Sequence, residues 1–149
     1  MSRETDLGLM LDEWAMKKLA YNYARGGDRN DSELFASVFT EDAVVISPQA
    51  TLEGRANLAK IPQMLHDMFV VTLHTVLNQT VTITGDTAEG ETYCIAYHMN
   101  HPKDGKQTRY DMYIRYQDQY RREAGQWRFT KRHLLVDWTE TVNVQPPGA

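Results

Sequence analysis

The hydrophobic period of this chain changes from helical to strand-like near residue 70, and this change limits the folds that it can adopt. Before residue 70, apolar residues recur at helical spacing; after it, they alternate with polar residues in long β-rich runs. These runs cover 70–84, 89–100, 107–123 and 126–139, with short turn signals between them. Helices followed by a meandering antiparallel sheet predict an α+β fold, in which the N-terminal helices pack on one face of a strongly curved sheet.

The segment before residue 70 carries its own start and stop signals. A first amphipathic helix is expected to end near Arg25, because Gly26-Gly27 follows. Asn30, followed three residues later by Glu33, resembles a capping box that opens a second, short helix. The other expected elements are a short hairpin over 44–53 and one helix beginning at Gly54, with Pro62 in its first turn or at a kink.

Length and composition fit one small domain. The 149 residues can bury a core without disulfides or metal, so we expect a single domain over 1–149, with its core at about 8–140 and a loose tail from residue 145. The formal net charge of −4 provides no basic face for nucleic acid. The single cysteine, Cys94, excludes an internal disulfide, and we expect it to be inert because no basic neighbour lowers its pKa. The polar start lacks a secretory signal and no apolar run could cross a bilayer, so we expect a cytoplasmic protein without membrane contacts.

Strand periodicity predicts a cavity between the helices and the sheet. Residues two apart share a face, so Cys94 and Ala96 point the same way as His98. The inward faces of the neighbouring strands are apolar with a few polar tips, which is the usual lining of a small-molecule pocket. The predicted lining residues are Val45, Cys94, Ala96, His98, Met112, Ile114, Tyr116, Leu134 and Val136, and Trp138 is expected on the face of Leu134 and Val136.

Two polar residues that lie far apart in the sequence could together remove a proton from a carbon atom. Asp28 follows the first helical stretch, and His74 lies inside the apolar run 70–76. A carboxylate that orients an imidazole and stabilises its charge makes that imidazole a general base. Arg132 falls on the inward face of the last run, where a guanidinium needs an anionic or carbonyl partner to offset its loss of hydration.

The order and spacing of short motifs resemble the SnoaL-like family of the nuclear transport factor 2-like superfamily. The motifs extend over about 8–140 and comprise Tyr23 to Asp28, Phe39 to Ala43, Gly54-Arg55, His74, Asn78, Gly85 to Ala88, Glu91 to Tyr93, Arg115 to Tyr120, Gly125 to Phe129, Arg132 and Asp137-Trp138. The resemblance implies a cone-shaped α+β barrel. That fold hosts dehydratases, isomerases, cyclases, binding proteins and subunits without chemistry, so the fold alone does not decide the function.

Within this family the site pattern resembles γ-hexachlorocyclohexane dehydrochlorinase, bile-acid dehydratase and scytalone dehydratase. The resemblance implies an Asp/His dyad in which His74 removes a carbon-bound proton and Asp28 fixes the tautomer of His74, without metal or organic cofactor. Tyr23 would donate a hydrogen bond or proton to a leaving hydroxyl or an enolate oxygen, and Arg132 would stabilise negative charge. His98 falls near the second histidine of scytalone dehydratase. The expected reaction is syn elimination of water from an apolar cyclic small molecule, catalysed by a homodimer or homotrimer.

Each of these residues also has a simpler interpretation. His74 and Tyr23 would then be core residues and Asp28 a loop carboxylate, and Arg132 would form a structural ion pair with an acidic neighbour such as Asp118. Three classes of function therefore stay open. A lyase or isomerase requires His74 in contact with Asp28 inside a cavity, and a carrier or sensor would have His74 blocked, exposed or bonded only to backbone. A structural subunit, like the small subunit of ring dioxygenases, would have a filled cavity and an apolar outer sheet face. Outward-facing residues that suit subunit contacts are Tyr93, Tyr97 and Tyr113.

Overall fold

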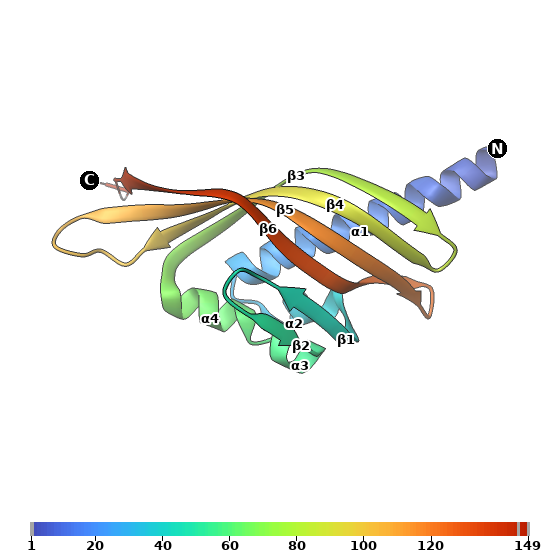
Figure 1. Cartoon of the computed structure of the whole chain (residues 1–149), viewed down its shortest axis with the longest axis horizontal. Coiled ribbons are helices and arrows are strands. Elements are labelled where there is room, and N and C mark those ends of the chain that lie inside the picture. Colours follow the sequence, from blue (N-terminus) through green and yellow to red (C-terminus); the bar gives the residue numbers. More distant parts are fainter. Residues whose placement is uncertain (1, 146, 149) are drawn as a thin grey trace.

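The helices and strands follow one another in the order that the sequence predicts (Figure 1). The computed structural model describes residues 2–145, 147 and 148. The predicted C-terminal tail includes Pro146 and Ala149, which lie outside the described residues, as does Met1. The helices are α1 (Arg3–Asp28), α2 (Ser32–Ser37), α3 (Arg55–Leu58) and α4 (Ile61–Met68). The strands are β1 (Phe39–Ile46), β2 (Thr51–Glu53), β3 (Phe69–Thr84), β4 (Thr87–Asn100), β5 (Gln107–Glu123) and β6 (Gln126–Val144).

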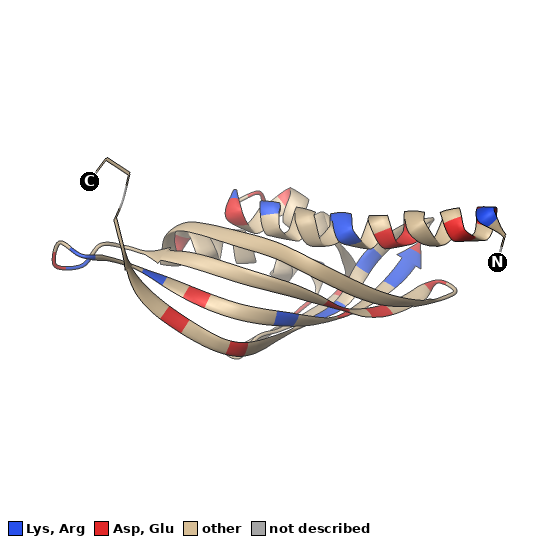
Figure 2. Cartoon of the chain, turned by 90° about the horizontal axis from the view of Figure 1, so that it is seen from above, with Lys and Arg blue, Asp and Glu red and all other residues tan. Residues whose placement is uncertain are grey.

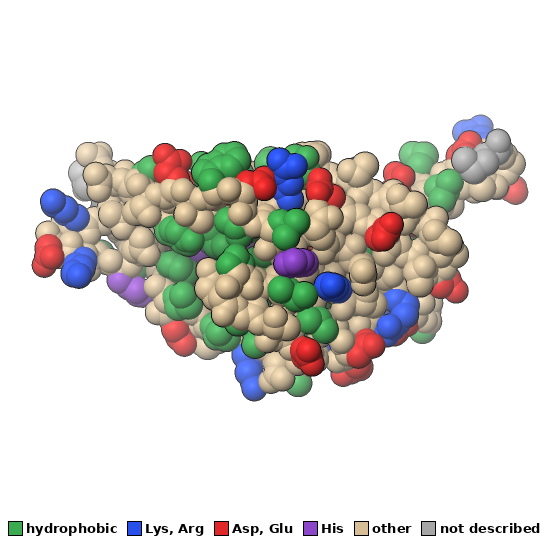
Figure 3. All heavy atoms as spheres, viewed as in Figure 1, with side chains coloured by type: hydrophobic (Ala, Val, Ile, Leu, Met, Phe, Trp, Pro, Cys, Tyr) green, Lys and Arg blue, Asp and Glu red, His purple; other side chains and the backbone are tan. Residues whose placement is uncertain are grey.

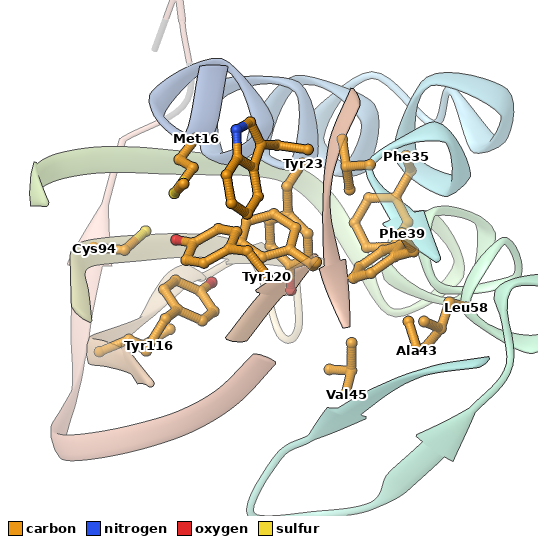
Figure 4. Packing of buried hydrophobic residues seen from close by; sticks show 14 of the residues in the cluster. Met16, Tyr23, Phe35, Phe39, Ala43, Val45, Leu58, Cys94, Tyr116 and Tyr120 are labelled. Atoms are coloured by element: carbon orange, nitrogen blue, oxygen red, sulfur yellow. The ribbon is translucent and has the colours of Figure 1, made fainter. Parts of the chain in front are cut away.

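The six strands form one sheet in the order β2-β1-β6-β5-β4-β3. All neighbours are antiparallel except β1 and β6, which are parallel. The sheet is strongly curved, and the helices lie on its concave side (Figure 2). Aromatic rings from α1, α2, β1 and β5 meet in the core between the two layers (Figure 4). The α+β class and the mostly antiparallel sheet expected from the change of period are therefore confirmed. None of the helices in the described part of the chain is long and apolar enough to cross a membrane.

The prediction that α1 ends near Arg25 is wrong. The helix continues for three more residues, and its last residue is Asp28. Gly26 and Gly27 lie inside the helix, which continues to Asp28. A Cβ atom on Gly26 would lie 2.7 Å from the backbone nitrogen of Phe35. The glycine is therefore needed for the close approach of α2 rather than for a helix end.

The other short elements differ from the prediction in detail. Asp31, not Asn30, caps α2, because its side chain accepts a hydrogen bond from the backbone N–H of Leu34. The single helix expected after Gly54 is divided into α3 and α4. Pro62 lies in the first turn of α4, where its missing N–H costs no hydrogen bond.

A β-bulge in β6 overturns the predicted orientation of Trp138. Tyr113 pairs with Trp138, whereas Ile114 pairs with Val136, so Asp137 is an extra residue in β6. Val136 therefore packs against the core, while Trp138 is exposed and stacks on Tyr113 with ring centroids 4.3 Å apart. Strict alternation along the strand could not reveal this shift.

Candidate functional site

A cavity of about 270 Å³ lies between the helices and the concave face of the sheet. Its lining is mainly apolar, and its ionisable side chains are those of Tyr23, His74, His98, Tyr110 and Tyr116. Apolar side chains also gather on the surface between α4 and β6 (Figure 3). An apolar enclosure with a few polar groups suits a small molecule that is itself largely apolar.

Most of the predicted lining residues do face this cavity. They are Val45, Ala96, His98, Met112, Ile114, Tyr116 and Leu134. Cys94 and Val136 are not among the residues that line the cavity. Cys94 belongs to the buried core, and Val136 packs against that core. The sequence reasoning missed the wall built by α4 and the start of β3, because its apolar spacing looks like ordinary core packing. That wall consists of Ile61, Met64, Leu65, Met68 and Phe69.

Asp28 and His74 are in direct contact beside the cavity. Oδ1 of Asp28 lies 2.6 Å from Nδ1 of His74, and Oδ2 accepts the backbone N–H of His74 at 2.8 Å. Thr72, two residues earlier on β3, donates its hydroxyl to Oδ1 at 2.9 Å. The side chains of His74 and Asp28 are only 8% and 15% exposed. The carboxylate is therefore fixed at three points and cannot turn away from the imidazole.

The protonation states follow from these contacts. Burial alone would raise the pKa of Asp28, but its hydrogen bonds with His74 and Thr72 and the charge of His74 together lower it. Asp28 is therefore a carboxylate at neutral pH, and a carboxylate accepts a proton-bearing Nδ1. In the neutral imidazole, this contact puts the proton on Nδ1 and leaves Nε2 of His74 with a free electron pair, on a ring that lines the cavity.

His98 on β4 adds a second imidazole to the cavity. Its Nδ1 lies 3.0 Å from the backbone carbonyl oxygen of Tyr110, so this nitrogen donates and Nε2 can only accept. The ring centroids of His74 and His98 are 6.0 Å apart. Burial lowers the pKa of His98, which makes it a neutral acceptor at neutral pH. Such a group suits a hydroxyl of a bound molecule.

Tyr23 from α1 and Tyr116 from β5 supply hydroxyl groups. Their ring centroids are 5.7 Å apart, and that of Tyr23 is 6.2 Å from the ring of His74. Burial raises the pKa of Tyr23, and it raises the pKa of Tyr116 further. Both side chains are therefore neutral hydrogen-bond donors at neutral pH.

Arg132 does not line the cavity. Its Nε and one terminal nitrogen donate to the two carboxylate oxygens of Asp118 at 2.8 and 3.0 Å, and both side chains are buried. The guanidinium carbon lies 3.7 Å from the ring centroid of Tyr116 and 4.4 Å from that of Tyr23. The ion pair with Asp118 is thus present, and the aromatic rings stand between the guanidinium and the cavity.

Two further properties bear on the chemistry of the site. Burial raises the pKa of Cys94 to about 12, which leaves the thiol protonated and unreactive at neutral pH. Within residues 2–145, 147 and 148, no group of three or more His, Cys, Asp or Glu side chains is arranged to hold a metal ion.

Comparisons with known proteins place this arrangement in a family. Residues 9–133 match the SnoaL-like domain. A hexachlorocyclohexane dehydrochlorinase, LinA type 2, has a similar structure with a TM-score of 0.86 and 21% sequence identity, covering 97% of this chain and 99% of that chain. A candidate scytalone dehydratase from Novosphingobium aromaticivorans gives a TM-score of 0.80 and 25% identity, with coverages of 97% and 98%.

The structural matches are not restricted to enzymes. A variant of Rv3472 from Mycobacterium tuberculosis, a protein of unknown function, gives a TM-score of 0.77 and 21% identity, covering 92% of this chain and 77% of that chain. No curated protein sequence matches the chain. These likenesses establish the fold and leave the activity to be argued from the site.

Proposed function

We propose that this chain, which belongs to the SnoaL-like domain family, is a lyase of the dehydratase type, in which His74 is the general base and Asp28 its partner. One observation carries the proposal: the contact of 2.6 Å between Asp28 and Nδ1 of His74, on a ring that lines an apolar cavity. A histidine held this way has its free nitrogen positioned for proton transfer, which typically contributes about 10² to 10⁴ in rate.

The reaction starts with removal of a proton from the carbon next to a carbonyl group. The C–H electron pair forms a carbon–carbon double bond, and the carbonyl π pair moves to oxygen as an enolate. His74 holds the proton as an imidazolium beside the carboxylate of Asp28. When the carbonyl re-forms, the electron pair of the enolate carbon–carbon double bond becomes a new double bond between the α-carbon and the β-carbon. The bond from the β-carbon to its hydroxyl group breaks, and its electron pair leaves with the hydroxyl oxygen. The leaving group takes the proton from His74, and the products are an enone and water.

The site geometry favours this reaction over the two non-catalytic alternatives. A carrier has no need of a buried carboxylate bonded to a histidine of its pocket. In this protein, Asp28 contacts both the ring and the backbone N–H of His74. A structural subunit needs no cavity at that ring. The names of two similar structures, a dehydrochlorinase and a candidate dehydratase, also denote eliminations. An isomerase would use the same first step and return the proton to another carbon.

The test combines two assays on the purified protein with a panel of cyclic β-hydroxyketones. Formation of the enone, followed by its ultraviolet absorbance, reports elimination. Exchange of the α-hydrogen in D₂O, followed by NMR, reports proton removal even when no group leaves. We expect both signals from the wild type and a loss of about 10² or more in His74→Ala. The matched control is His101→Ala, because His101 is exposed in the turn between β4 and β5.

Each outcome decides between the candidates. Exchange without water loss across the panel would favour the isomerase. Absence of both signals from the wild type would favour a carrier. Full activity in His74→Ala would overturn the assignment of the base.

A further inference from the structure

The helix α1 carries large apolar side chains on the side that faces away from the sheet. These side chains form the outer row of α1, and they are Leu7, Met10, Leu11, Trp14 and Tyr21. Steps of three, four or seven residues keep them on one side of the helix. The buried residues of α1, which include Met16 and Ala20, lie on the other side. A helix at the surface of a monomer needs one apolar side, so the second one indicates a partner.

The area of the outer row fits a protein interface. Its members are between 45% and 65% exposed. Five side chains of about 200 Å² that are about half exposed present about 500 Å² of apolar surface. Because interfaces are about 60% apolar, the whole contact would cover about 800 Å² on each partner. That value is the usual area per partner in a stable complex, which is about 800 Å².

The charges around the outer row are divided along the helix (Figure 2). Glu4 and Glu13 lie in the N-terminal half, whereas Lys17, Lys18 and Arg25 lie in the C-terminal half. Among the residues that the structure describes, none forms an ion pair with Glu13, Lys17 or Lys18. One half of the helix is therefore complementary in charge to the other half.

We propose that the outer row of α1 binds the outer row of a second copy of this chain, with the two helices antiparallel. A two-fold axis near Trp14 brings Leu7 of each copy to Tyr21 of the other. A surface can bind itself across such an axis only if it is self-complementary, and the divided charges of α1 meet this condition. The N-terminal end of α1 extends beyond the sheet, which leaves room for the second helix beside it (Figure 1).

The charges also select the direction of the second helix. In the antiparallel pair, Glu4 of each copy lies near Arg25 of the other. Glu13 and Lys17 are four residues apart on one flank of the outer row, and the two-fold axis places each flank against the same flank of the second copy. Glu13 therefore faces Lys17 of the second copy. A parallel pair would place each of these residues beside a residue of the same charge.

Sedimentation velocity of the purified chain at micromolar concentrations measures the association. The wild type is expected to form a reversible dimer. Trp14→Gln should weaken this dimer on the order of tenfold or more, because a tryptophan at the centre of an interface contributes strongly to binding. The matched control is Trp138→Gln, since Trp138 is also exposed but stacks on Tyr113 on the outer face of the sheet. Its dissociation constant should equal that of the wild type.

A charge exchange tests the antiparallel arrangement. Glu13→Lys and Lys17→Glu should each weaken the dimer on the order of tenfold, because each change occurs twice across the two-fold axis. The double variant Glu13→Lys/Lys17→Glu restores opposite charges across the interface and should recover the affinity of the wild type. Glu89→Lys, at an exposed position of β4, is the control for the change in net charge and should have no effect.

Three results would overturn the proposal. The first is a wild type that stays monomeric, and the second is a dimer weakened by Trp138→Gln but not by a folded Trp14→Gln, as verified by circular dichroism. The third is a double variant that associates no better than the single variants. Sedimentation with vesicles of phosphatidylcholine and phosphatidylglycerol tests a lipid surface as the occupant. We expect no binding, since Glu4 and Glu13 repel anionic lipid. Vesicle binding that Trp14→Gln abolishes would also overturn the proposal.

Discussion

Oδ1 of Asp28, at the end of α1, lies 2.6 Å from Nδ1 of His74 on β3, although 46 residues separate them. The last turn of α1 makes this contact possible, because the helix continues through Gly26 and Gly27 past Arg25 and carries the carboxylate of Asp28 to β3. The same carboxylate accepts the backbone N–H of His74, so strand and imidazole are fixed together. A small change at Asp28 should therefore alter chemistry more than folding.

Asp28→Asn is expected to prevent His74 from acting as the base while the protein still folds. An asparagine can still accept the backbone N–H of His74 through its oxygen, but its amide donates to Nδ1 and so moves the ring proton to Nε2. We expect elimination to fall by about 10² to 10⁴. Imidazole ¹⁵N chemical shifts should show the reversed tautomer. Asp104→Asn, in the exposed turn after β4, is the matched control, and a normal rate in Asp28→Asn would contradict the proposed role of the dyad.

The lowered pKa of Asp28 also predicts how stability changes with acid. A carboxyl whose pKa in the folded state lies below its ordinary value of 3.8 stabilises the protein above that pH, and this contribution is lost as the pH falls through the lower folded value. The difference in melting temperature between the wild type and Asp28→Asn should therefore narrow once the pH drops below 3.8. A difference that stays constant from neutral pH to pH 2 would show that the carboxyl has no shifted pKa.

Replacing either of two glycines of α1 by alanine is expected to change the stability of the protein in opposite directions. Gly26→Ala would place a Cβ atom 2.7 Å from the backbone of Phe35, so α2 must move, and we expect a loss of about 1–3 kcal/mol in the free energy of unfolding. Gly8 has nothing within 4 Å, so Gly8→Ala should stabilise the helix by about 0.5–1 kcal/mol. Urea denaturation of both variants and of the wild type measures these changes in the free energy of unfolding. Equal effects would mean that helix propensity alone governs Gly26.

The raised pKa of Cys94 predicts a thiol that does not react in the folded protein. A pKa of about 12 leaves almost no thiolate at pH 7.5, and the side chain is buried among core residues. Iodoacetamide should therefore label Cys94 only after unfolding in guanidinium, as followed by mass spectrometry. Labelling of the native protein at the rate of a free thiol would show that the core opens at β4.

The sequence predicted the fold class and most of the strand faces, because both follow from the hydrophobic period. It could not reveal the bulge at Asp137, because one extra residue reverses the face of Trp138 without changing the local pattern. Gly26 predicts a helix end, whereas it serves a close helix contact, because glycine is favoured at both kinds of position. The sequence pattern of Arg132 fits both a residue that lines the cavity and a buried residue paired with Asp118. Only its position in the structure distinguishes the two.

Breaking the pair between Arg132 and Asp118 should destabilise the fold strongly. Asp118 accepts two hydrogen bonds from Arg132 and one each from Thr92 and Tyr120, all within the core. Asp118→Asn leaves a buried guanidinium without its counter-charge, which typically costs about 3–5 kcal/mol. Adding Arg132→Met should recover part of that loss, since no buried charge then remains unpaired. A double variant less stable than Asp118→Asn would mean that the guanidinium stabilises the core mainly through its contacts with the aromatic rings.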